Sequence, residues 1–541
     1  MAHDWYRRAI FYSLDVECFQ DSRSDGIGDF RGLIERLEYL EWLGIDAIWL
    51  MPFYPSPNRD DGYDVSDYLD VDARLGDLAD FDELIAAARE RGMRVVTDLV
   101  VNHTSDQHPW FQEARRDPRS ARRDWYVWTD DPSRAPSFAP IFPGEQDQSW
   151  TYDEVARAYY LHRFYSSQPD LNIDNPAVRN AIADIMRFWL ARGVAGFRVD
   201  AAPILIERFD HGSREVGKLE ELLTMLRRVA DGADPPAILL AEANVPADEI
   251  PLYFGAGDRM HMIFGFLFNQ WSFVAHARQS AAPLRDGIAR LPERPSGAQW
   301  LHFLRHHDEL TLDQLDERHR REVLDAFAPD PAARIYGRGI RHRLLPIFGG
   351  DRCRAEMALA LSFALPGTPM IRYGDEIGMG DDLSLPGRMA VRTVMQWTGE
   401  PGAGFSRARP ERWARPVVSR GPYGHTRVNV AAQRGDPRSL LSRTRALIHT
   451  RRALAGVFGA GHATLVEGAP ESVFAHRFDG DAGSVLCVHQ LADRAVELGG
   501  LEDAISGARE EVARDARSEP WEPRRARPVT LAPFGYRWWL L

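Results

Sequence analysis

Lysine is almost absent from this sequence. Lys218 is the only lysine among 541 residues, so nearly all of the 66 basic residues are arginine. Catalysis through a Schiff base needs a lysine amine, and Lys218 lies in a polar stretch with a helical pattern. We therefore set pyridoxal-type chemistry aside.

Cysteine is also scarce, and long hydrophobic runs are missing. Cys18, Cys353 and Cys487 are odd in number, far apart and without the spacing of metal ligands. This pattern argues against a disulfide framework and favours a reducing cytoplasm. No stretch approaches the roughly 18 uninterrupted apolar residues of a membrane helix, and the first residues lack the form of a signal peptide. The sequence thus predicts a cytoplasmic protein with no membrane partner.

The chain carries an excess of acidic residues. Its formal net charge is −13, with 79 Asp and Glu against 66 Lys and Arg. Nucleic acids and anionic membranes attract basic surfaces, so this charge argues against both as partners. A chain of 541 residues exceeds one ordinary domain, and we expect two or three domains, one of them large. Assembly into a homo-oligomer stays open.

Short apolar segments alternate with helical stretches along most of the chain. The apolar segments resemble parallel strands that are buried on both faces, and glycines such as Gly44 and Gly92 end the helical stretches. The expected strands are residues 9–16, 47–51, 94–101, 196–201, 236–243, 262–268, 300–304 and 369–373. The expected helices include residues 30–43, 80–91, 176–192, 214–230 and 354–364. Eight strands with crossovers between them predict an α/β fold with a closed (β/α)8 barrel, a TIM barrel.

Two parts of the chain depart from this alternation. Residues 104–172 are rich in Pro, Asp, Ser and Trp, which is typical of a functional insertion. After about residue 455, short strand-like runs with turns between them predict an antiparallel β domain. The expected domains are a catalytic barrel, or A domain (1–103 and 173–455), a B-domain insertion after the third strand (104–172) and a C-terminal β-sandwich (456–541).

Chemically active side chains follow the carboxyl ends of the expected strands. In a TIM barrel these ends meet on one face, where the chemistry takes place. The residues concerned are Asp98, Asn102, His103, Arg198, Asp200, Glu242, His306, His307 and Asp308. Acids gathered on one rim repel one another, which argues against a purely structural origin.

Arg198, Asp200 and Glu242 have the features of a catalytic group. Arg198 and Asp200 are two residues apart on one strand, so their side chains point to the same side. A guanidinium at this position keeps Asp200 ionised and ready to act as a nucleophile, although a structural ion pair is the alternative. Glu242 is flanked by alanines at the end of an apolar strand, a setting that keeps a carboxylic acid protonated.

One ionised and one protonated carboxyl group are the tools of glycoside cleavage. Asp308 is then a candidate for binding sugar hydroxyls and distorting the ring, and His103 and His307 are candidate hydrogen-bond donors to the sugar. The residues alone leave other acid–base chemistries open.

Four stretches resemble the sequence regions of the α-amylase family, glycoside hydrolase family 13. They are Asp-Leu-Val-Val-Asn-His (98–103), Gly-Phe-Arg-Val-Asp-Ala (196–201), Leu-Ala-Glu-Ala-Asn (240–244) and His-His-Asp (306–308), and residues 168–172 look like a fifth region. The resemblance covers about residues 9–400. It implies a retaining mechanism with Asp200 as nucleophile, Glu242 as acid/base and Asp308 as transition-state stabiliser, with no cofactor required for the chemistry.

Within this family, further stretches resemble the enzymes that isomerise maltose and trehalose. They are residues 62–68, 102–111, 307–312, 373–380 and 391–397. The resemblance implies a small α-glucoside as substrate, with Tyr63 stacked on the sugar ring and Asp64 paired with Arg392 to close the far end of the pocket. The other expected substrate-binding residues are His103, Phe164, Arg198 and His307. An exo-acting α-glucosidase or a transglucosylase with another acceptor is the alternative.

The chain departs from the pattern of this group at four places. His306 replaces a usual Asn, Val245-Pro246 replaces Gln-Trp, Val394 replaces Pro and Arg372 replaces an aromatic residue. The missing tryptophan belongs to the acceptor side, where isomerisation separates from hydrolysis.

Two structural calcium sites are suggested by analogy with the family. The first would use Asp21, Asp25, Asp29 and the Ile27 carbonyl, but Arg23 stands where an oxygen ligand is normal. A metal-free loop held by Arg23 is the alternative. The second site would use oxygen ligands from Asn102, Asp170, Ile204, Leu205 and Glu207.

Overall fold

The computed structural model describes residues 4–205, 216–459, 462–480, 482–522 and 529–541. Eight parallel strands close into a barrel in the order β1-β2-β3-β7-β8-β9-β10-β14. They are β1 Phe11–Leu14, β2 Ala47–Leu50, β3 Arg94–Leu99, β7 Gly196–Val199, β8 Ile238–Ala241, β9 Met262–Phe264, β10 Gln299–His302 and β14 Thr368–Arg372. Each strand overlaps one that the sequence predicts, so the predicted TIM barrel is confirmed.

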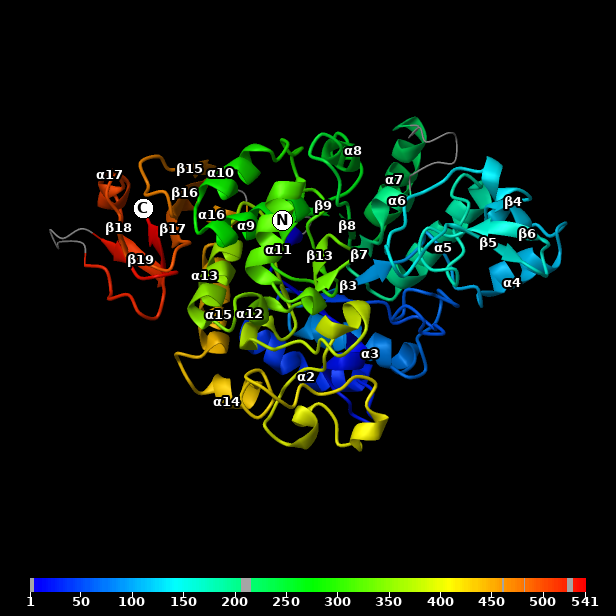
Figure 1. Ribbon diagram of the computed structural model, residues 1–541, viewed down its shortest axis with the longest axis horizontal. Helices are drawn as coiled ribbons and strands as arrows, with labels where there is room; N and C mark the ends of the chain where they lie inside the picture. The colour runs from blue at the N-terminus through cyan, green and yellow to red at the C-terminus, as the bar shows by residue number, and fades with distance from the viewer. Residues whose placement is uncertain (1–3, 206–215, 460–461, 481, 523–528) are drawn as a thin grey trace.

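Helices surround the barrel strands (Figure 1). Those that the sequence predicts are α2 Phe30–Leu43, α3 Leu78–Glu90, α5 Pro176–Ala191, α7 Val216–Asp231 and α13 Arg352–Phe363. Further helices are α9 Phe266–Arg278, α10 Ala282–Ala289, α11 Glu317–Phe327 and α15 Leu440–Ala453. Short helices are α1 Val16–Phe19, α6 Ala202–Leu205, α8 Ile250–Phe254, α12 Leu344–Ile347, α14 Val430–Arg434 and α16 Ala455–Phe458.

The ends of α2 show why sequence signals located these helices well. At its start, the Asp29 side chain accepts a hydrogen bond from the amide of Gly32, which satisfies a free helix donor. At its end, Gly44 adopts a φ of 99°, a left-handed conformation that favours glycine. The helix therefore begins and ends where the sequence predicts.

The insertion between β3 and β7 builds a small sheet of its own. It contains α4 Pro109–Arg116 and the strands β4 Trp128–Thr129, β5 Trp150–Asp153 and β6 Ala158–Leu161, paired in the order β4-β6-β5. Phe111 of α4 stacks on Trp128 with ring centroids 5.6 Å apart. The insertion lies at one end of the molecule and the C-terminal strands at the other, with the barrel between them (Figure 1).

The C-terminal part is antiparallel, as predicted. A five-stranded sheet has the order β15-β16-β17-β21-β19, and β18 pairs with β20 in a second sheet. The strands are β15 His462–Leu465, β16 Val473–Gly480, β17 Gly483–Gln490, β18 Val496–Glu497, β19 Glu510–Arg514, β20 Thr530–Leu531 and β21 Tyr536–Leu540, and α17 spans Glu502–Ser506. Trp538 and Trp539 of β21 are both fully buried, in separate hydrophobic clusters. Strand alternation sends their rings to opposite faces of the sheet, and both faces are covered.

The boundaries between the barrel, the insertion and the C-terminal part stay a prediction. None of the helices among the described residues combines the length and apolar character that crossing a membrane would need.

Candidate active site

A cavity of about 290 Å³ lies at the carboxyl ends of the barrel strands. Its lining includes all three predicted catalytic residues, Asp200, Glu242 and Asp308. Residues of the insertion, among them Phe142 and Phe164, form part of the wall. The barrel and the insertion therefore build this site together.

Arg198 contacts three carboxylates at the base of the site. Its Nη1 lies 3.0 Å from Asp98 Oδ1 and also donates to Asp200, and its Nη2 lies 2.7 Å from Glu242 Oε2. Only 2% of the Arg198 side chain is exposed. Arg198 and Asp200 point to the same side, as predicted. The guanidinium of Arg198 also contacts Glu242, the predicted acid.

The two carboxyl groups that share Arg198 have raised pKa values. Burial raises the pKa of Asp200 to about 6, although Arg198 acts in the opposite direction. Burial raises the pKa of Glu242 to about 7, and the neighbouring charge of Asp200 adds to this rise against Arg198. Both groups lose water that would stabilise the ionised form. Asp200 therefore ionises at a lower pH than Glu242, as an ionised nucleophile and a protonated acid require.

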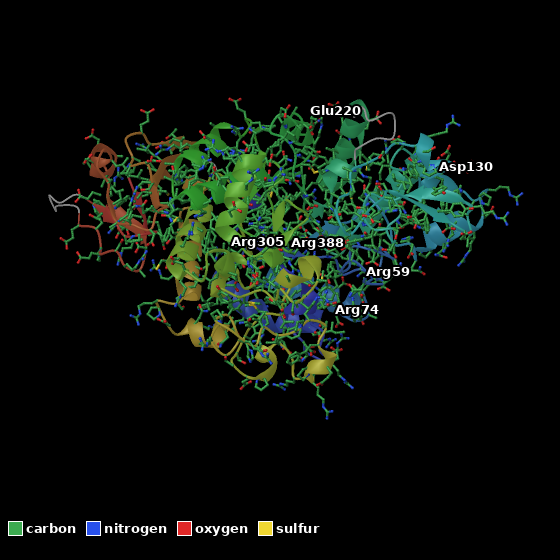
Figure 2. The ribbon with its side chains drawn as sticks, viewed as in Figure 1. Arg59, Arg74, Asp130, Glu220, Arg305 and Arg388 are labelled. Atoms are coloured by element: carbon green, nitrogen blue, oxygen red, sulfur yellow. The ribbon has the colours of Figure 1, made fainter. Side chains whose placement is uncertain are left out.

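Asp308 is held ionised by two arginines on one oxygen and a histidine on the other. Its Oδ1 lies 2.6 Å from Arg392 Nη2 and 2.8 Å from Arg388 Nη1, and its Oδ2 lies 3.1 Å from His307 Nε2. Burial opposes ionisation, but a hydrogen bond from His307 and the charges of Arg388 and Arg392 outweigh it and hold the pKa of Asp308 well below its usual range. Arg388 is labelled in the central part of the molecule in Figure 2.

The predicted pairing of Asp64 with Arg392 is wrong. The Asp64 carboxylate is fully buried, and it accepts hydrogen bonds from the Ser56 hydroxyl (2.7 Å) and from the amides of Arg59 (3.1 Å) and Asp60 (3.2 Å). It is not part of the cavity lining. Asp64 therefore organises the preceding loop and does not face a sugar.

The carboxylates that meet the two arginines are Asp60 and Asp61. Arg388 Nη2 lies 2.8 Å from Asp60 Oδ1, and Arg392 Nη1 lies 2.5 Å from Asp61 Oδ2. Asp60 lines the cavity beside Asp308. Each arginine thus ties Asp308 to this loop, through two ion pairs in place of the single predicted one.

A turn with left-handed residues explains why Asp60, and not Asp64, faces the cavity. Asn58 (φ 60°), Asp61 (φ 53°) and Gly62 (φ 92°) all have positive φ, which reverses the chain over a few residues. The reversal directs Asp60 into the cavity and returns Asp64 to the loop amides. Sequence spacing alone does not reveal which acid of such a turn faces the site.

The other predicted substrate-binding residues divide into two groups. Tyr63, His103 and Phe164 line the cavity. The Tyr63 hydroxyl donates to Asp98 (3.0 Å) and lies 2.8 Å from His307 Nε2, and the Tyr63 carbonyl is 3.1 Å from His103 Nε2. Arg198, His307 and Arg392 are not part of the lining and act through the carboxylates that they contact. Burial lowers the pKa of His103 to about 4 and that of His307 to about 3, so both are neutral at pH 7.

Several lining residues were missed by the sequence reasoning. They are Asp60, Phe142, Asn244, Phe266, Glu309, Thr311, Asp313, Arg338 and Arg388. The Asn244 amide donates to Asp313 (2.7 Å), and Arg338 donates to the Ile141 carbonyl of the insertion (2.8 Å). Arg388 lies four residues before Arg392 in the same arginine-containing stretch, and this spacing was the one available signal. Pro246, at the position of the missing tryptophan, is exposed and lies outside the lining.

The first candidate calcium loop is held by hydrogen bonds and by Arg23. Asp21 accepts from the amide of Ser24 (2.6 Å) and from the Ser406 hydroxyl (2.5 Å). Arg23 Nε lies 3.5 Å from both Asp25 Oδ2 and Asp29 Oδ2. The contacts are those of the arginine-held alternative, because a guanidinium occupies the space between two of the expected ligands. The amide of Ile27 donates to Asp25 Oδ1 (3.1 Å).

Two of the predicted ligands of the second calcium site, Asn102 and Asp170, lie close together. Asn102 donates to Asp170 Oδ1 (3.2 Å), and the same oxygen accepts from the amide of Arg163 (3.1 Å). Ile204 and Leu205 belong to α6, beside the cavity. Glu207 lies outside the described residues. The amide and carboxylate oxygens of Asn102 and Asp170 are donors that suit Ca²⁺, and the site stays a prediction.

The chain belongs to the α-amylase family. The model of the α-amylase catalytic domain matches residues 16–316 and 340–457, which confirms the resemblance that the sequence motifs suggest. The barrel, the insertion after β3 and the carboxylates at the strand ends are thus those of a glycoside-active enzyme.

Curated relatives and solved structures show which members of the family are similar to this chain. The chain is 45% identical over 495 residues to a trehalose synthase/amylase of Mycobacterium tuberculosis, covering 90% of this chain and 82% of that protein. It is 46% identical over 489 residues to a trehalose synthase of Thermus thermophilus, covering 90% of this chain and 50% of that protein. The crystal structure of a trehalulose synthase from Pseudomonas mesoacidophila superposes with a TM-score of 0.78 at 27% identity, covering 99% of each chain.

The corrected roles of Asp60 and Asp64 can be tested by matched substitutions. Asp60→Asn should lower kcat/KM for an aryl α-glucoside about 100-fold with little change in Tm, because it removes the partner of Arg388 in the cavity. Asp64→Asn should keep kcat/KM within about threefold and lower the free energy of unfolding by about 1–2 kcal/mol, because it weakens buried hydrogen bonds. Steady-state kinetics and thermal unfolding measure both. The opposite pattern would restore Asp64 to the substrate site.

Proposed function

We propose that this enzyme is a retaining α-glucoside isomerase that interconverts maltose and trehalose. One observation carries the proposal: a single guanidinium, that of Arg198, contacts both Asp200 and Glu242. Two carboxyl groups bridged in this way lie close together, and a short separation of about 5–5.5 Å is typical of retaining enzymes, whereas inverting enzymes use about 6.5–9.5 Å. The trehalose synthases among the relatives support the choice of sugars.

In the first step Asp200 and Glu242 cleave maltose. Asp200 attacks the anomeric carbon of the glucosyl unit, and the bond to the bridging oxygen breaks as Glu242 gives that oxygen its proton. This leaves a glucosyl ester on Asp200, a molecule of glucose and an ionised Glu242. Asp308, held ionised by His307 and Arg388, is placed to bind hydroxyls of the distorted ring and to favour the positive charge that develops on it.

In the second step the same glucose attacks through another hydroxyl. Glu242 takes the proton of the anomeric hydroxyl of the retained glucose, and the oxygen of that hydroxyl attacks the ester carbon. The bond from this carbon to Asp200 breaks, trehalose forms, and both carboxyl groups return to their first state. Atoms and protons balance without water, so the reaction is an isomerisation as long as glucose stays in the cavity.

The cavity lining has groups that suit a retained glucose. Asn244, Glu309, Asp313 and Arg338 are polar, and Phe142 of the insertion adds an aromatic surface beside them. Polar groups around an apolar wall are typical of sugar binding. Arg338 also donates to the insertion, which links the acceptor side to the part of the chain that covers it.

An exo-acting α-glucosidase, or a transglucosylase with another acceptor, is the second candidate. Its support is Pro246, which stands at the position of the missing tryptophan, is exposed and lies outside the cavity lining. Both candidates use the same first step, and they differ only in which molecule reaches the ester on Asp200. The relatives favour the isomerase.

Three further expectations belong to the same proposal. Calcium at Asn102 and Asp170 would be structural, because neither residue lines the cavity. The three cysteines, Cys18, Cys353 and Cys487, are free, which supports a reducing compartment such as the cytoplasm. The proposed reaction is the same for a monomer and for a homo-oligomer.

Product analysis with maltose tests the proposed reaction. Purified enzyme with maltose and added 13C-labelled glucose should give mostly unlabelled trehalose with little unlabelled glucose, because the glucose that attacks is the one that was released. NMR or separation of the sugars measures both. Labelled trehalose would indicate exchange with solution and a transglucosylase, and glucose as the main product would indicate an α-glucosidase.

The pH dependence of kcat/KM tests the division of roles. Activity should rise with pH through about 6 as Asp200 ionises and fall above about 7 as Glu242 loses its proton. The apparent values belong to the coupled pair. With an aryl α-glucoside whose leaving group needs no acid, Glu242→Gln should remove the fall at high pH and keep the rise. A profile of Glu242→Gln that still falls above pH 7 would contradict the acid role.

A further inference from the structure

A series of alternating charges runs outward from Asp308, beyond the groups that line the cavity. Arg392 contacts Asp308 through Nη2, and its Nη1 lies 2.5 Å from Asp61 Oδ2. The other oxygen of Asp61 accepts from Arg415. Arg392, Asp61 and Arg415 are not part of the cavity lining. Arg415 is thus connected to Asp308 by three successive contacts between a guanidinium and a carboxylate.

These ion pairs are buried. The side chains of Arg392 and Asp61 are 0% and 4% exposed, and that of Arg415 is 16% exposed. Burial acts to raise the pKa of Asp61, but the charges of Arg392 and Arg415 outweigh it and lower the pKa below its usual value. Removing one partner of a buried ion pair leaves the other charge uncompensated, which is costly. Asp61 is therefore held ionised by the two arginines together.

Two further buried acids, Asp15 and Glu17, lie beside Asp61. Burial and the charges of the neighbouring acids raise the pKa of Asp15 and raise that of Glu17 to about 7. Arg415 opposes both rises, and its Nη2 lies 3.5 Å from Glu17 Oε1. Arg74, which is labelled in Figure 2, contacts Glu17 at 2.7 Å. Arg415 is therefore a cation that acts on all three acids.

The main chain next to Arg415 is fixed by the first candidate calcium loop, residues 21–29. The amide of Ala414 donates to the Gly26 carbonyl (3.0 Å). Gly26 has a φ of 96°, and a Cβ at this position would clash with the Arg412 carbonyl oxygen. A residue without a side chain is needed for such a close approach of two main-chain segments. The loop therefore holds the segment from which Arg415 reaches Asp61.

We infer that Arg415 is a positioning residue for Asp308 and acts through Asp61 and Arg392. With Arg415 in place, Asp61 has its own cation and Arg392 is available to Asp308. Without Arg415, the buried acids attract Arg392 away from Asp308, because opposite charges attract strongly where water is absent. Asp308 then loses the orientation that stabilisation of the transition state requires. The inference rests on the role of Asp308 in the proposed function.

The inference also gives the 21–29 loop a function that needs no bound ion. The loop fixes the segment that carries Arg415, and Arg415 fixes the carboxylate that holds Arg392. A structural element outside the cavity thus contributes to the geometry of Asp308.

Steady-state kinetics of Arg415→Met with an aryl α-glucoside test the inference. The variant should lower kcat about tenfold and keep KM within about twofold, because a displaced Asp308 weakens binding of the transition state more than binding of the substrate. Arg415→Lys keeps a charge beside Asp61 and should restore most of the lost kcat. An unchanged kcat in Arg415→Met, or a raised KM at unchanged kcat, would overturn the inference.

Arg443→Met is the matched control. Arg443 of α15 is buried to a similar degree, with 21% of its side chain exposed, and its Nε lies 2.9 Å from Glu356 Oε1 of α13. Both variants lose a partly buried ion pair and should have a lower Tm. Arg443→Met should nevertheless keep kcat within about twofold. A tenfold loss of kcat in this control would mean that destabilisation alone lowers activity, and it would refute the assignment to Arg415.

A double-mutant cycle with Asp308→Asn tests whether the effect passes through Asp308. Arg415→Met should cost about tenfold in kcat in the unmodified enzyme and less than twofold in the Asp308→Asn background, because the group that Arg415 positions is already altered there. Equal losses in both backgrounds would refute the inference and leave the role of Asp308 intact. Full activity of Asp308→Asn alone would contradict the proposed function, and the inference with it. If Arg415→Met does not fold, Asp61→Asn takes its place in the same cycle.

Discussion

The contact of Arg198 with three carboxylates is the constraint on which the rest of the site depends. The register of the barrel places it: Asp98 of β3 stands opposite Arg198 of β7, which in turn pairs with Leu240, two residues before Glu242. A slip of one residue between these strands would turn the side chains to the other face. The closed barrel allows no such slip. Arg198 and its three carboxylates, which are costly to bury, therefore keep a fixed geometry.

Burial sets the pKa values of the carboxyl groups that contact Arg198, and this makes them useful for catalysis. Water would stabilise all three acids in the ionised form and make them alike. In the buried site a single cation is shared between them, so the pKa values of Asp200 and Glu242 are both raised but remain apart. The cost of burying such a group is high when a partner is missing, which makes Arg198 indispensable for the fold as well as for the chemistry.

A second set of arginines performs the same task for Asp308. Arg388 and Arg392 bond it to Asp60 and Asp61, so a carboxylate from one strand end is fixed by a loop that follows another. With only one lysine in the chain, these buried pairs all use the planar guanidinium, which reaches two carboxylates at once.

The sequence was most informative where local rules are strong. Buried parallel strands and glycine-ended helices follow from short-range patterns, so the eight barrel strands, and with them Asp200 and Glu242, could be placed in advance. The exchange of Asp64 for Asp60 could not, because it depends on three positive φ angles in one turn. The contribution of Phe142 was also hidden, since an irregular insertion has no period from which its inward side chains can be read. That of Arg338 depends on its contact with the same insertion.

Mass spectrometry of the trapped intermediate tests the central claim most directly. The Glu242→Gln variant, incubated with 5-fluoro-α-glucosyl fluoride, should form a covalent ester, because fluoride leaves without an acid and the following step lacks its base. The account predicts one added 5-fluoroglucosyl group on the peptide that contains Asp200. A label on Asp308, or no stable label while fluoride is released, would contradict the assignment of Asp200 as the ionised partner of Arg198.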